Sequence, residues 1–307
     1  MLVLFIPWVI LILNLSSLIL LCCKKWRVSL LLLVVVFLAN SYYHVFPLNF
    51  NRDNSEDRDF KVMSWNIDGS SSTIQSRIQA IAKTILKEKA DVVFIAEDHN
   101  YCNGALDSLL KTTYPYSTYS FNSRYHVSHH FYSKYPLGVH TRIAYDSTSI
   151  SYIVQSSVNI DGSIIDLFGC HLTSNNYSQE TGKRVGKLDG IYGLLLYCKS
   201  ISEAAKVRAK ESNKLVDSIK TERPTIVMGD FNDISGSSAL DILENNGMFD
   251  AWTKGGLGYG ATIHTPFPYR IDHIYYNDNI KLNSIKKIDA EGLSDHDALI
   301  GVFEIEK

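Results

Sequence analysis

The apolar residues of this chain are concentrated at its N-terminal end, and this concentration divides the 307 residues into two parts. Residues 2–23 contain no charged side chain, and residues 28–46 form a second apolar run. A helix of about 20 apolar residues is long enough to cross the hydrocarbon core of a bilayer. We therefore predict two N-terminal transmembrane helices within residues 1–47.

A short basic segment, Lys24-Lys25-Trp26-Arg27, separates the two apolar runs. Basic segments between transmembrane helices usually lie on the cytoplasmic side. Both outer helix ends and the rest of the chain then lie on the other side, which predicts an integral membrane protein with an extracytoplasmic main domain. A cleaved signal peptide is the alternative, but the first run is long for one, no basic segment precedes it and no small-residue cleavage site follows it.

The chain after the apolar runs consists of a linker and one domain. Residues 48–59 are polar and charged and predict the linker, whereas residues 60–307 are long enough for one α/β domain with a substantial core. Because Lys24, Lys25 and Arg27 are the only charges in residues 1–46, the net charge of −2 leaves −5 for the remainder. This part lacks the broad positive surface of a non-specific nucleic-acid binder, although a divalent cation would neutralise phosphate charge locally.

Polar side chains follow apolar strands of the main domain at the points where these strands end. In residues 226–233 (IVMGDFND), a short buried strand ends at Gly229, and Asp230 and Asn232 follow it. Because alternate residues of an extended segment point to the same side, the carboxylate and the amide project together. Five further polar groups occur along the chain, four of them also at strand ends: Asn66 with Asp68, Glu97, His171, Asp272, and Asp295 with His296.

Carboxylates, amides and histidines in this combination are the groups that metal-assisted phosphoester hydrolysis requires. Carboxylate oxygens bind Mg²⁺ or Mn²⁺, and an acid can activate a water molecule. A histidine that a buried acid keeps oriented and protonated can donate to phosphate oxygens. Each group alone is also typical of an ordinary polar turn, so the prediction rests on their combination.

The order of these groups resembles that of the endonuclease/exonuclease/phosphatase family, which includes deoxyribonuclease I, repair endonucleases, bacterial sphingomyelinases and inositol polyphosphate phosphatases. One such motif is weakly specific, but the ordered set is strongly specific and covers residues 60–307. The motifs are Ser64-Trp65-Asn66, Glu97, Cys170-His171-Leu172, Gly229-Asp230-Phe231-Asn232, RIDHI at residues 270–274, and Ser294-Asp295-His296. The resemblance implies an α/β fold, a four-layer sandwich of two mixed β-sheets that are flanked by helices.

The resemblance also implies a site for Mg²⁺ or Mn²⁺. Glu97 matches the family's direct metal ligand, and Asn66 and Asp68 match further residues of the metal site. Asp295 matches an acid near the metal. The glutamine that usually precedes the metal-binding glutamate is replaced here by Ala96, so the support of the ligand departs from the family pattern.

The remaining residues match the catalytic groups of the family. Asp230 matches the acid that positions and deprotonates the attacking water, and Asn232 matches the donor to the scissile phosphate. His296 matches the histidine that stabilises the pentacovalent phosphate, and Asp272 matches its orienting partner. His171 matches a second active-site histidine of the deoxyribonuclease and sphingomyelinase branches.

These residues together predict a Mg²⁺- or Mn²⁺-dependent phosphodiesterase in which water attacks the phosphate in line, and an endonuclease-like hydrolase of nucleic acids is the first expectation. One alternative is hydrolysis of a phospholipid headgroup, such as that of sphingomyelin, or of an inositol phosphate. Another is a membrane-anchored binding module without activity, against which the intact set of acids argues. We expect a monomeric catalytic domain, with specificity residing in loops at residues 175–188 and 255–261, the second of which is glycine-rich and predicts a flexible lip.

Overall fold

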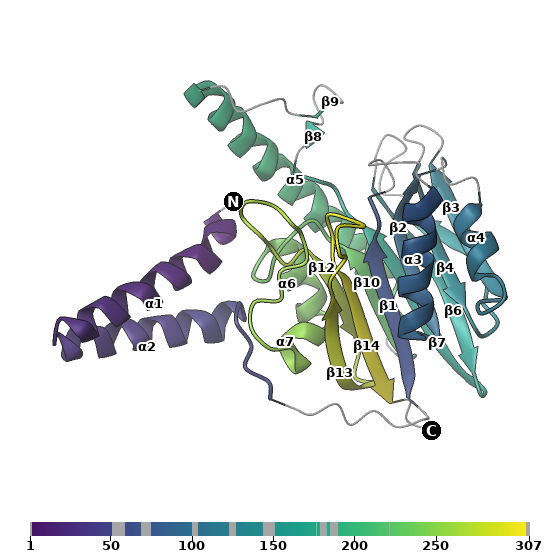
Figure 1. Ribbon diagram of the computed structural model, residues 1–307, viewed down its shortest axis with the longest axis horizontal. Helices are drawn as coiled ribbons and strands as arrows, with labels where there is room; N and C mark the ends of the chain where they lie inside the picture. The colour runs from purple at the N-terminus through teal and green to yellow at the C-terminus, as the bar shows by residue number, and fades with distance from the viewer. Residues whose placement is uncertain are drawn as a thin grey trace.

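A computed structural model shows a helical hairpin that projects from a domain of two β-sheets (Figure 1). Most of the predicted linker, residues 51–58, lies outside the described residues, as does much of the loop at 175–188. Within that loop, β8 (Tyr177–Ser178) and β9 (Lys183–Arg184) form a short antiparallel pair. The structure describes residues 2–50, 59–68, 75–99, 104–122, 127–143, 151–175, 177–178, 183–184, 190–220 and 222–304.

The first sheet has six strands and includes both the first and the last strand of the domain. Its strand order is β13 (Lys281–Ile288), β14 (Ala298–Glu304), β1 (Phe60–Asn66), β2 (Val92–His99), β4 (Val127–Ser133) and β3 (Tyr116–Asn122). Strand β1 runs parallel to β2 and antiparallel to β14, so this sheet is mixed.

The second sheet also has six strands. Its order is β11 (Phe249–Asp250), β12 (Asp272–Tyr276), β10 (Thr225–Asp230), β7 (Ser163–His171), β6 (Tyr152–Ile160) and β5 (Thr141–Ile143). Strand β10 runs parallel to β7 and antiparallel to β12. The connection between β6 and β7 is a tight turn at Asp161 and Gly162, which both have the positive φ that such a turn requires.

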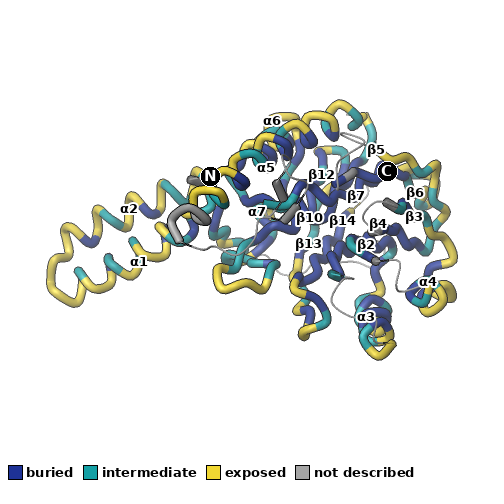
Figure 2. The backbone as a smooth tube through the Cα atoms, turned by 90° about the horizontal axis from the view of Figure 1, so that it is seen from above, coloured by how far each residue is buried: buried dark blue, intermediate teal, exposed yellow. Residues whose placement is uncertain are grey.

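Apolar side chains fill the space between the two sheets, and helices cover the outer faces (Figure 2). The sheets approach closely at Gly169, where an added Cβ would lie 2.1 Å from the ring of Phe94. The first sheet is covered by α3 (Gln75–Glu88) and α4 (Ala105–Leu110), and the second by α5 (Gly190–Ser218) and α6 (Ser238–Asn245). The short helix α7 (Ala251–Gly255) contributes to the core between the sheets. The expectation of two mixed sheets flanked by helices is confirmed.

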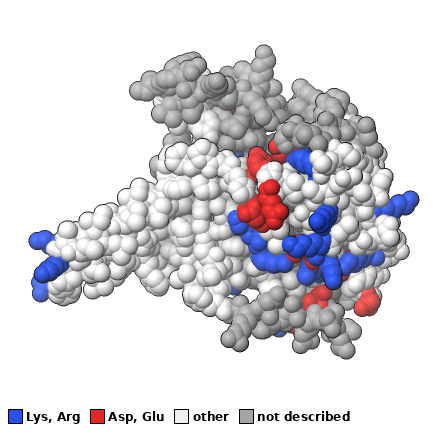
Figure 3. Space-filling model, in the orientation of Figure 1, with Lys and Arg blue, Asp and Glu red and all other residues white. Residues whose placement is uncertain are grey.

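The N-terminal residues form a helical hairpin with an apolar surface. A 3-10 helix (Leu2–Phe5) leads into α1 (Ile6–Cys22), and α2 (Trp26–Tyr43) runs back beside it. The hydroxyls of Ser17 and Ser29 each donate to the other residue's backbone carbonyl, at 3.1 and 2.9 Å. Figure 3 shows no Lys, Arg, Asp or Glu on this side of the hairpin between its basic tip and the domain.

The two helices are shorter than the apolar runs that predicted them. Residues 2–5 belong to the 3-10 helix, and α2 ends at Tyr43 because His44 has a left-handed backbone conformation. Asn40 caps this end by accepting a hydrogen bond from the backbone N–H of Phe46 at 2.7 Å. Among the described helices, α2 alone is long and apolar enough to cross a membrane, and α1 is a shorter apolar helix. A pair of transmembrane helices therefore stays a prediction.

The glycine-rich loop at residues 255–261 is held against the chain that follows the hairpin. Gly258 N–H donates to the carbonyl of Pro47 at 2.8 Å, and Asn49 N–H donates to the carbonyl of Gly256 at 3.3 Å. The ring of Phe46 lies 5.4 Å from that of Tyr259. This loop is therefore a contact between the hairpin and the domain, which differs from the flexible lip that its glycines predict.

Candidate active site

The register of the second sheet places three predicted residues side by side. Asp230 at the end of β10 is the direct neighbour of His171 in β7 and of Asp272 in β12. The first sheet adds Asn66 from the end of β1, whose Nδ2 donates to Asp230 Oδ2 at 3.1 Å. The candidate site therefore lies where strand ends of both sheets meet.

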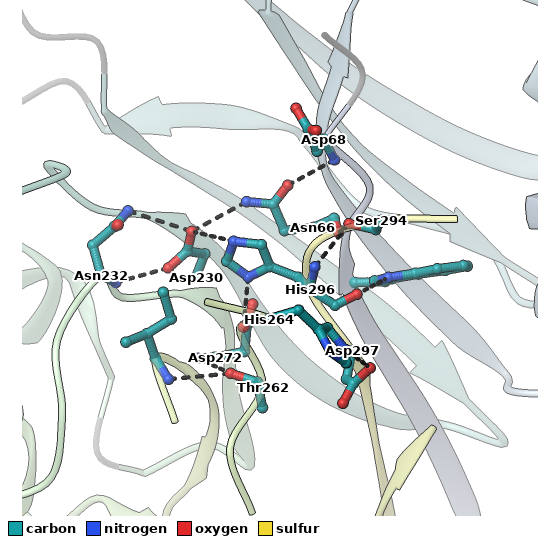
Figure 4. A network of polar contacts seen from close by, with 12 residues as sticks. Asn66, Asp68, Asp230, Asn232, Thr262, His264, Asp272, Ser294, His296 and Asp297 are labelled. Carbon is teal, nitrogen blue, oxygen red and sulfur yellow. Dashed lines mark hydrogen bonds and ion pairs between the residues drawn. The ribbon is translucent and has the colours of Figure 1, made fainter. Parts of the chain in front are cut away.

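The amide of Asn66 connects the acids of the two sheets, and Figure 4 shows its contacts with Asp230 and Asp68. Besides its bond to Asp230, the same Nδ2 donates to Glu97 Oε1 at 3.0 Å. Its Oδ1 accepts a hydrogen bond from the backbone N–H of Asp68 at 3.0 Å. Asn66 is buried, and both the nitrogen and the oxygen of its amide are hydrogen-bonded. In this arrangement the nitrogen bridges two carboxylates.

Asp230 is a buried carboxylate with a raised pKa. Its Oδ1 accepts from Asn232 N–H at 2.8 Å, and its Oδ2 receives a longer contact from Asn232 Nδ2 at 3.3 Å. Burial raises the pKa of Asp230 to about 6, opposed by the attraction of His296 and assisted by repulsion from Asp272. A carboxylate with such a pKa can exchange protons near neutral pH.

His296 is held by Asp272 as a protonated imidazole. Its Nδ1 lies 2.8 Å from Asp272 Oδ2, and its Nε2 faces Asp230 Oδ2 at 3.9 Å. Burial alone would lower the pKa of His296, but the carboxylates of Asp272 and Asp230 outweigh it and raise that pKa to about 10. The ring is therefore cationic at neutral pH, with Nε2 as its outward donor.

His171 is the second histidine of the site and is oriented differently. Its Nε2 lies 3.1 Å from Glu97 Oε1 and 3.8 Å from Asp230 Oδ2. Burial lowers the pKa of His171, but these two carboxylates more than reverse that effect. Burial raises the pKa of Glu97, but the hydrogen bonds from His171 and Asn66 and the charges of His171 and His296 together outweigh it and hold that pKa well below its usual range. Within the described part of the chain, the buried Nδ1 of His171 has no hydrogen-bond partner, so no acid supports this ring from behind.

Three of the predicted residues have a strained backbone. Asp68, Glu97 and Asn232 have φ values of 38°, 55° and 50°, which non-glycine residues rarely adopt. Each such conformation costs roughly 1–3 kcal/mol and persists where the surroundings enforce it, as they commonly do at functional sites. At Glu97 the cause is an irregularity in the pairing of β2 with β4, between Ile95 and Asp98, which interrupts the alternation of the strand.

The acidic side chains of Asp68, Glu97 and Asp295 are near enough to influence one another at the rim of the site. Asp295 is exposed there, and partial burial raises its pKa, opposed by His296 and assisted by the nearby carboxylates of Asp68 and Glu97. Ligand atoms of Glu97, His171 and Asp230 also lie within 4.8 Å of one another. Hard oxygen donors around concentrated negative charge fit Mg²⁺ or Mn²⁺. The structure thus brings all nine predicted residues together.

Two supporting residues were not predicted as part of the site. Thr262 Oγ1 accepts from the backbone N–H groups of Ile271 and Asp272, both at 3.1 Å. Ser294 Oγ donates to the carbonyl of Asn66 at 2.8 Å and accepts from His296 N–H at 3.0 Å. Ser294 belongs to a motif that the sequence reveals, whereas nothing in the sequence distinguishes Thr262 from other loop threonines.

Two buried charged residues of α5, Arg208 and Glu211, support the loops after β7 and β10. Arg208 Nε donates to Asp233 Oδ2 at 2.8 Å, and its Nη1 donates to the carbonyl of Thr173, also at 2.8 Å. Glu211 accepts from the backbone N–H of Thr173 at 3.0 Å and from the hydroxyl of Ser151. Because Thr173 and Asp233 follow the site residues closely, α5 fixes the positions of both loops.

The other described histidines near the site make structural contacts. His130 Nε2 lies 3.0 Å from the hydroxyl of Ser128. His273 contacts Asp250 Oδ2 at 3.1 Å and a backbone carbonyl at 3.0 Å, on the opposite side of β12 from its neighbour Asp272. The ring of His129 lies 5.4 Å from that of His171, and burial keeps the pKa of His129 well below its usual value.

Comparison with known proteins yields one family and a set of similar structures. The model of the "Endonuclease/Exonuclease/phosphatase family" matches residues 63–296. No curated protein sequence matches the chain.

Two solved structures illustrate the structural similarity. The endonuclease/exonuclease/phosphatase from Beutenbergia cavernae DSM 12333 aligns over 81% of this chain and 72% of its own, with 17% identity and a TM-score of 0.61. D. rerio TDP2 complexed with single strand DNA product aligns over 81% of this chain and 100% of its own, with 16% identity and a TM-score of 0.58. At these identities the similarity is one of fold.

Proposed function

The chain belongs to the endonuclease/exonuclease/phosphatase family, and from this premise we propose that it is a divalent-metal-dependent phosphodiesterase of the nuclease type. Members of this family are typically hydrolases that act on phosphodiester bonds, and the matched segment contains all nine candidate residues. One arrangement carries the proposal. Asp230, a buried carboxylate with a pKa of about 6, faces the imidazolium of His296, which Asp272 holds in place.

Asp230 is the proposed general base. Its carboxylate accepts a proton from the water that attacks phosphorus, and the hydrogen bonds from Asn66 and Asn232 keep it oriented for that transfer. A pKa of about 6 leaves Asp230 mainly ionised at neutral pH and basic enough to take the proton.

His296 and Asn232 are the proposed donors to the phosphate. Nε2 of His296 is beyond hydrogen-bond distance of Asp230, at 3.9 Å, so it is available to a phosphate oxygen as charge develops there. Asn232 Nδ2 makes one firm bond, to the carbonyl of Leu172 at 2.9 Å, and one long contact of 3.3 Å that a substrate oxygen can replace.

Glu97, Asp68 and Asp295 would hold the divalent metal, Mg²⁺ or Mn²⁺, with Asn66 beside them. Bound there, the ion would supply Lewis-acid stabilisation of the charge on the phosphate. The chain's own part is to concentrate these carboxylates, and the strained backbone of Asp68 and Glu97 is consistent with such a fixed arrangement.

A nucleic acid is the proposed substrate class. D. rerio TDP2 has been solved with a single strand DNA product, and its fold aligns with most of this chain. A phospholipid headgroup is the second candidate, because the loop that carries Thr262 also contacts the apolar hairpin and so brings the site close to any bilayer that the hairpin enters.

We also propose that α2, together with α1, anchors the protein in a membrane with the domain on the extracytoplasmic side. The basic tip, Lys24, Lys25 and Arg27, lies at the end of the hairpin away from the domain, and basic segments favour the cytoplasm. A fusion of alkaline phosphatase after residue 60 should be active in intact cells. An inactive fusion would contradict the orientation.

The substrate is tested with the full-length protein in detergent or nanodiscs, supplied with Mg²⁺. Plasmid DNA, single-stranded DNA, RNA, sphingomyelin, phosphoinositides and bis-p-nitrophenyl phosphate are offered in parallel. Cleavage of nucleic acid that is lost in Asp230→Asn and retained in Asp217→Asn, an exposed acid on α5, is the expected result. Headgroup release instead would favour the lipid substrate, and no hydrolysis of any substrate would favour the inactive binding module.

A further inference from the structure

The surface of the domain around the base of the hairpin is rich in exposed apolar side chains. Leu257 is 54% exposed and Phe267 is 63% exposed, both in the loop between α7 and β12. Leu48 is exposed beside Leu257, with which it forms a backbone bridge. Leu195 and Leu196 are exposed in the first half of α5. These five residues are called the hairpin-base face below.

Direct contacts fix this face relative to the hairpin. Trp8 of α1 packs edge-on against Phe267, with ring centres 5.5 Å apart, and its Nε1 donates to the hydroxyl of Tyr269 at 3.3 Å. The backbone N–H of Gly258 donates to the carbonyl of Pro47, which lies just after α2. Both ends of the hairpin therefore hold the same loop, and that loop cannot move away from the hairpin base without breaking these contacts.

The first half of α5 lies on the same side of the domain. Residues 190–198 contain no charged side chain, and Figure 1 shows the first half of α5 rising from the domain above the N-terminal end of the hairpin. Burial and the neighbouring hydroxyl of Tyr269, to which Trp8 donates, raise the pKa of Tyr197. The exposed leucines of α5 thus continue the surface that begins at Phe267.

We infer that the hairpin-base face lies on the surface of the bilayer that the hairpin enters, with Leu195, Leu257 and Phe267 at the boundary between headgroups and acyl chains. This inference rests on the proposed membrane anchor. A bilayer is the occupant because the loop that carries Leu257 and Phe267 is held at the base of the apolar hairpin, so a bilayer that surrounds the hairpin lies next to this face. Exposed aromatic and aliphatic residues at such a boundary stabilise the interfacial position.

The hairpin-base face is connected to the active site through a single loop. The loop that carries Leu257 and Phe267 also carries Thr262, which binds the backbone of Asp272, the partner of His296. Contact with the bilayer therefore holds the loop that supports the His296–Asp272 pair. A phosphodiester presented at the membrane surface would then reach the site without leaving that surface.

Spin labels on the full-length protein in phospholipid nanodiscs test the inference. Cys22, Cys23, Cys102 and Cys198 are first replaced by Ala, and Cys170 is buried and is kept. Labels are then attached singly at Leu195→Cys, Leu257→Cys and Phe267→Cys, and collisions with oxygen and with a water-soluble nickel chelate are measured. The expected oxygen-to-nickel collision ratio is several-fold higher at all three than at the control, Val139→Cys.

Val139 is a matched control because it is apolar and highly exposed. It lies just before β5, at the edge of the second sheet opposite β11 and β12. Nickel collisions at Leu195, Leu257 and Phe267 as frequent as at Val139 would overturn the inference. Low collision rates with both reagents would indicate a protein contact on the face and would also overturn it.

A further label distinguishes the inference from the proposals on which it depends. Leu31→Cys lies on the exposed side of α2 and should collide mainly with oxygen if the hairpin is embedded. Frequent nickel collisions at Leu31 would contradict both the membrane anchor and the contact of the face with the bilayer. Frequent nickel collisions only at the hairpin-base face would contradict that contact alone. The collision measurement needs no hydrolysis, so failure of the proposed phosphodiesterase activity is scored separately, on bis-p-nitrophenyl phosphate. Circular dichroism confirms that each labelled variant is folded.

Discussion

His296 Nδ1 and Asp272 Oδ2 lie 2.8 Å apart, and this pair keeps the imidazole protonated and turned toward Asp230. Asp272→Asn preserves the size of the side chain and removes its charge. We expect kcat/KM to fall by about 10²–10³-fold, because the oriented imidazolium is lost. The fall of the rate at high pH, expected near the His296 pKa of about 10, should move to lower pH, because Asp272 is a main cause of that raised pKa.

Rates of bis-p-nitrophenyl phosphate hydrolysis between pH 5 and about pH 10.5 measure both effects. His264→Gln is the control, since its ring is half-exposed and pairs with Asp297 outside the proposed chemistry. An equal loss of activity in His264→Gln would show that any change to these loops disables the site, and would remove the special role of Asp272.

The carboxyl of Asp230 sets the expected limit of activity at low pH. A general base must be ionised, and burial raises the pKa of Asp230 to about 6, so the rate should fall as the pH drops through about 6. Below that point we expect a loss of about tenfold per pH unit in kcat/KM, measured at saturating metal. A rate that stays constant down to pH 4.5, about the pKa of an ordinary carboxyl, would contradict the assignment of Asp230 as the base.

Chelation should abolish hydrolysis, and added Mg²⁺ or Mn²⁺ should restore it, because Glu97, Asp68 and Asp295 concentrate negative charge at one rim. Glu97→Gln should raise the metal concentration needed for half-maximal activity by about 10- to 100-fold. Thermal unfolding with and without metal gives a second readout, since a bound ion stabilises the folded chain. Asp217→Asn, which removes an exposed acid from α5, should leave both measurements unchanged. Full activity of wild-type protein in excess chelator would refute the metal requirement.

Polar residues at the ends of apolar strands, taken together with the order of the family's motifs, predicted the residues of the candidate site, and strand ends meet at one edge of a sheet. Asp230, His171 and Asp272 illustrate this, since register alone makes them neighbours. Arg208 was beyond prediction, because a charged residue on an amphipathic helix is normally solvated and its burial depends on how α5 packs against two loops. The loop at residues 255–261 was misjudged for a related reason, since its contacts come from the distant segment after α2.

Arg208 should matter more for stability than any surface ion pair of this chain. Arg208→Met leaves the buried carboxylate of Asp233 without its partner, and breaking a buried pair in this way costs about 3–5 kcal/mol of unfolding free energy. Lys281→Met breaks the exposed pair with Glu304 and should cost about 0–1 kcal/mol. Urea denaturation followed by circular dichroism compares the two variants. Equal losses would show that the Arg208–Asp233 pair contributes no more than a solvated one.

Gly229 allows Asp230 to pair in register with His171, and two glycine substitutions isolate this effect. Gly229 has a φ of 142°, and an added Cβ would lie 2.0 Å from the backbone oxygen of Cys170. Gly162 also has a positive φ, of 94°, but an added Cβ would meet nothing within 4 Å. Gly162→Ala therefore tests backbone strain alone, at roughly 1–3 kcal/mol.

Gly229→Ala introduces backbone strain and also a collision with β7, the strand that carries His171. We expect it to lose more stability than Gly162→Ala in urea denaturation. Any folded fraction should show reduced kcat with little change in KM, because β10 and β7 must separate where Asp230 faces His171. Equal stability of the two variants, with full activity in Gly229→Ala, would show that the close approach of these strands is not needed to align the site.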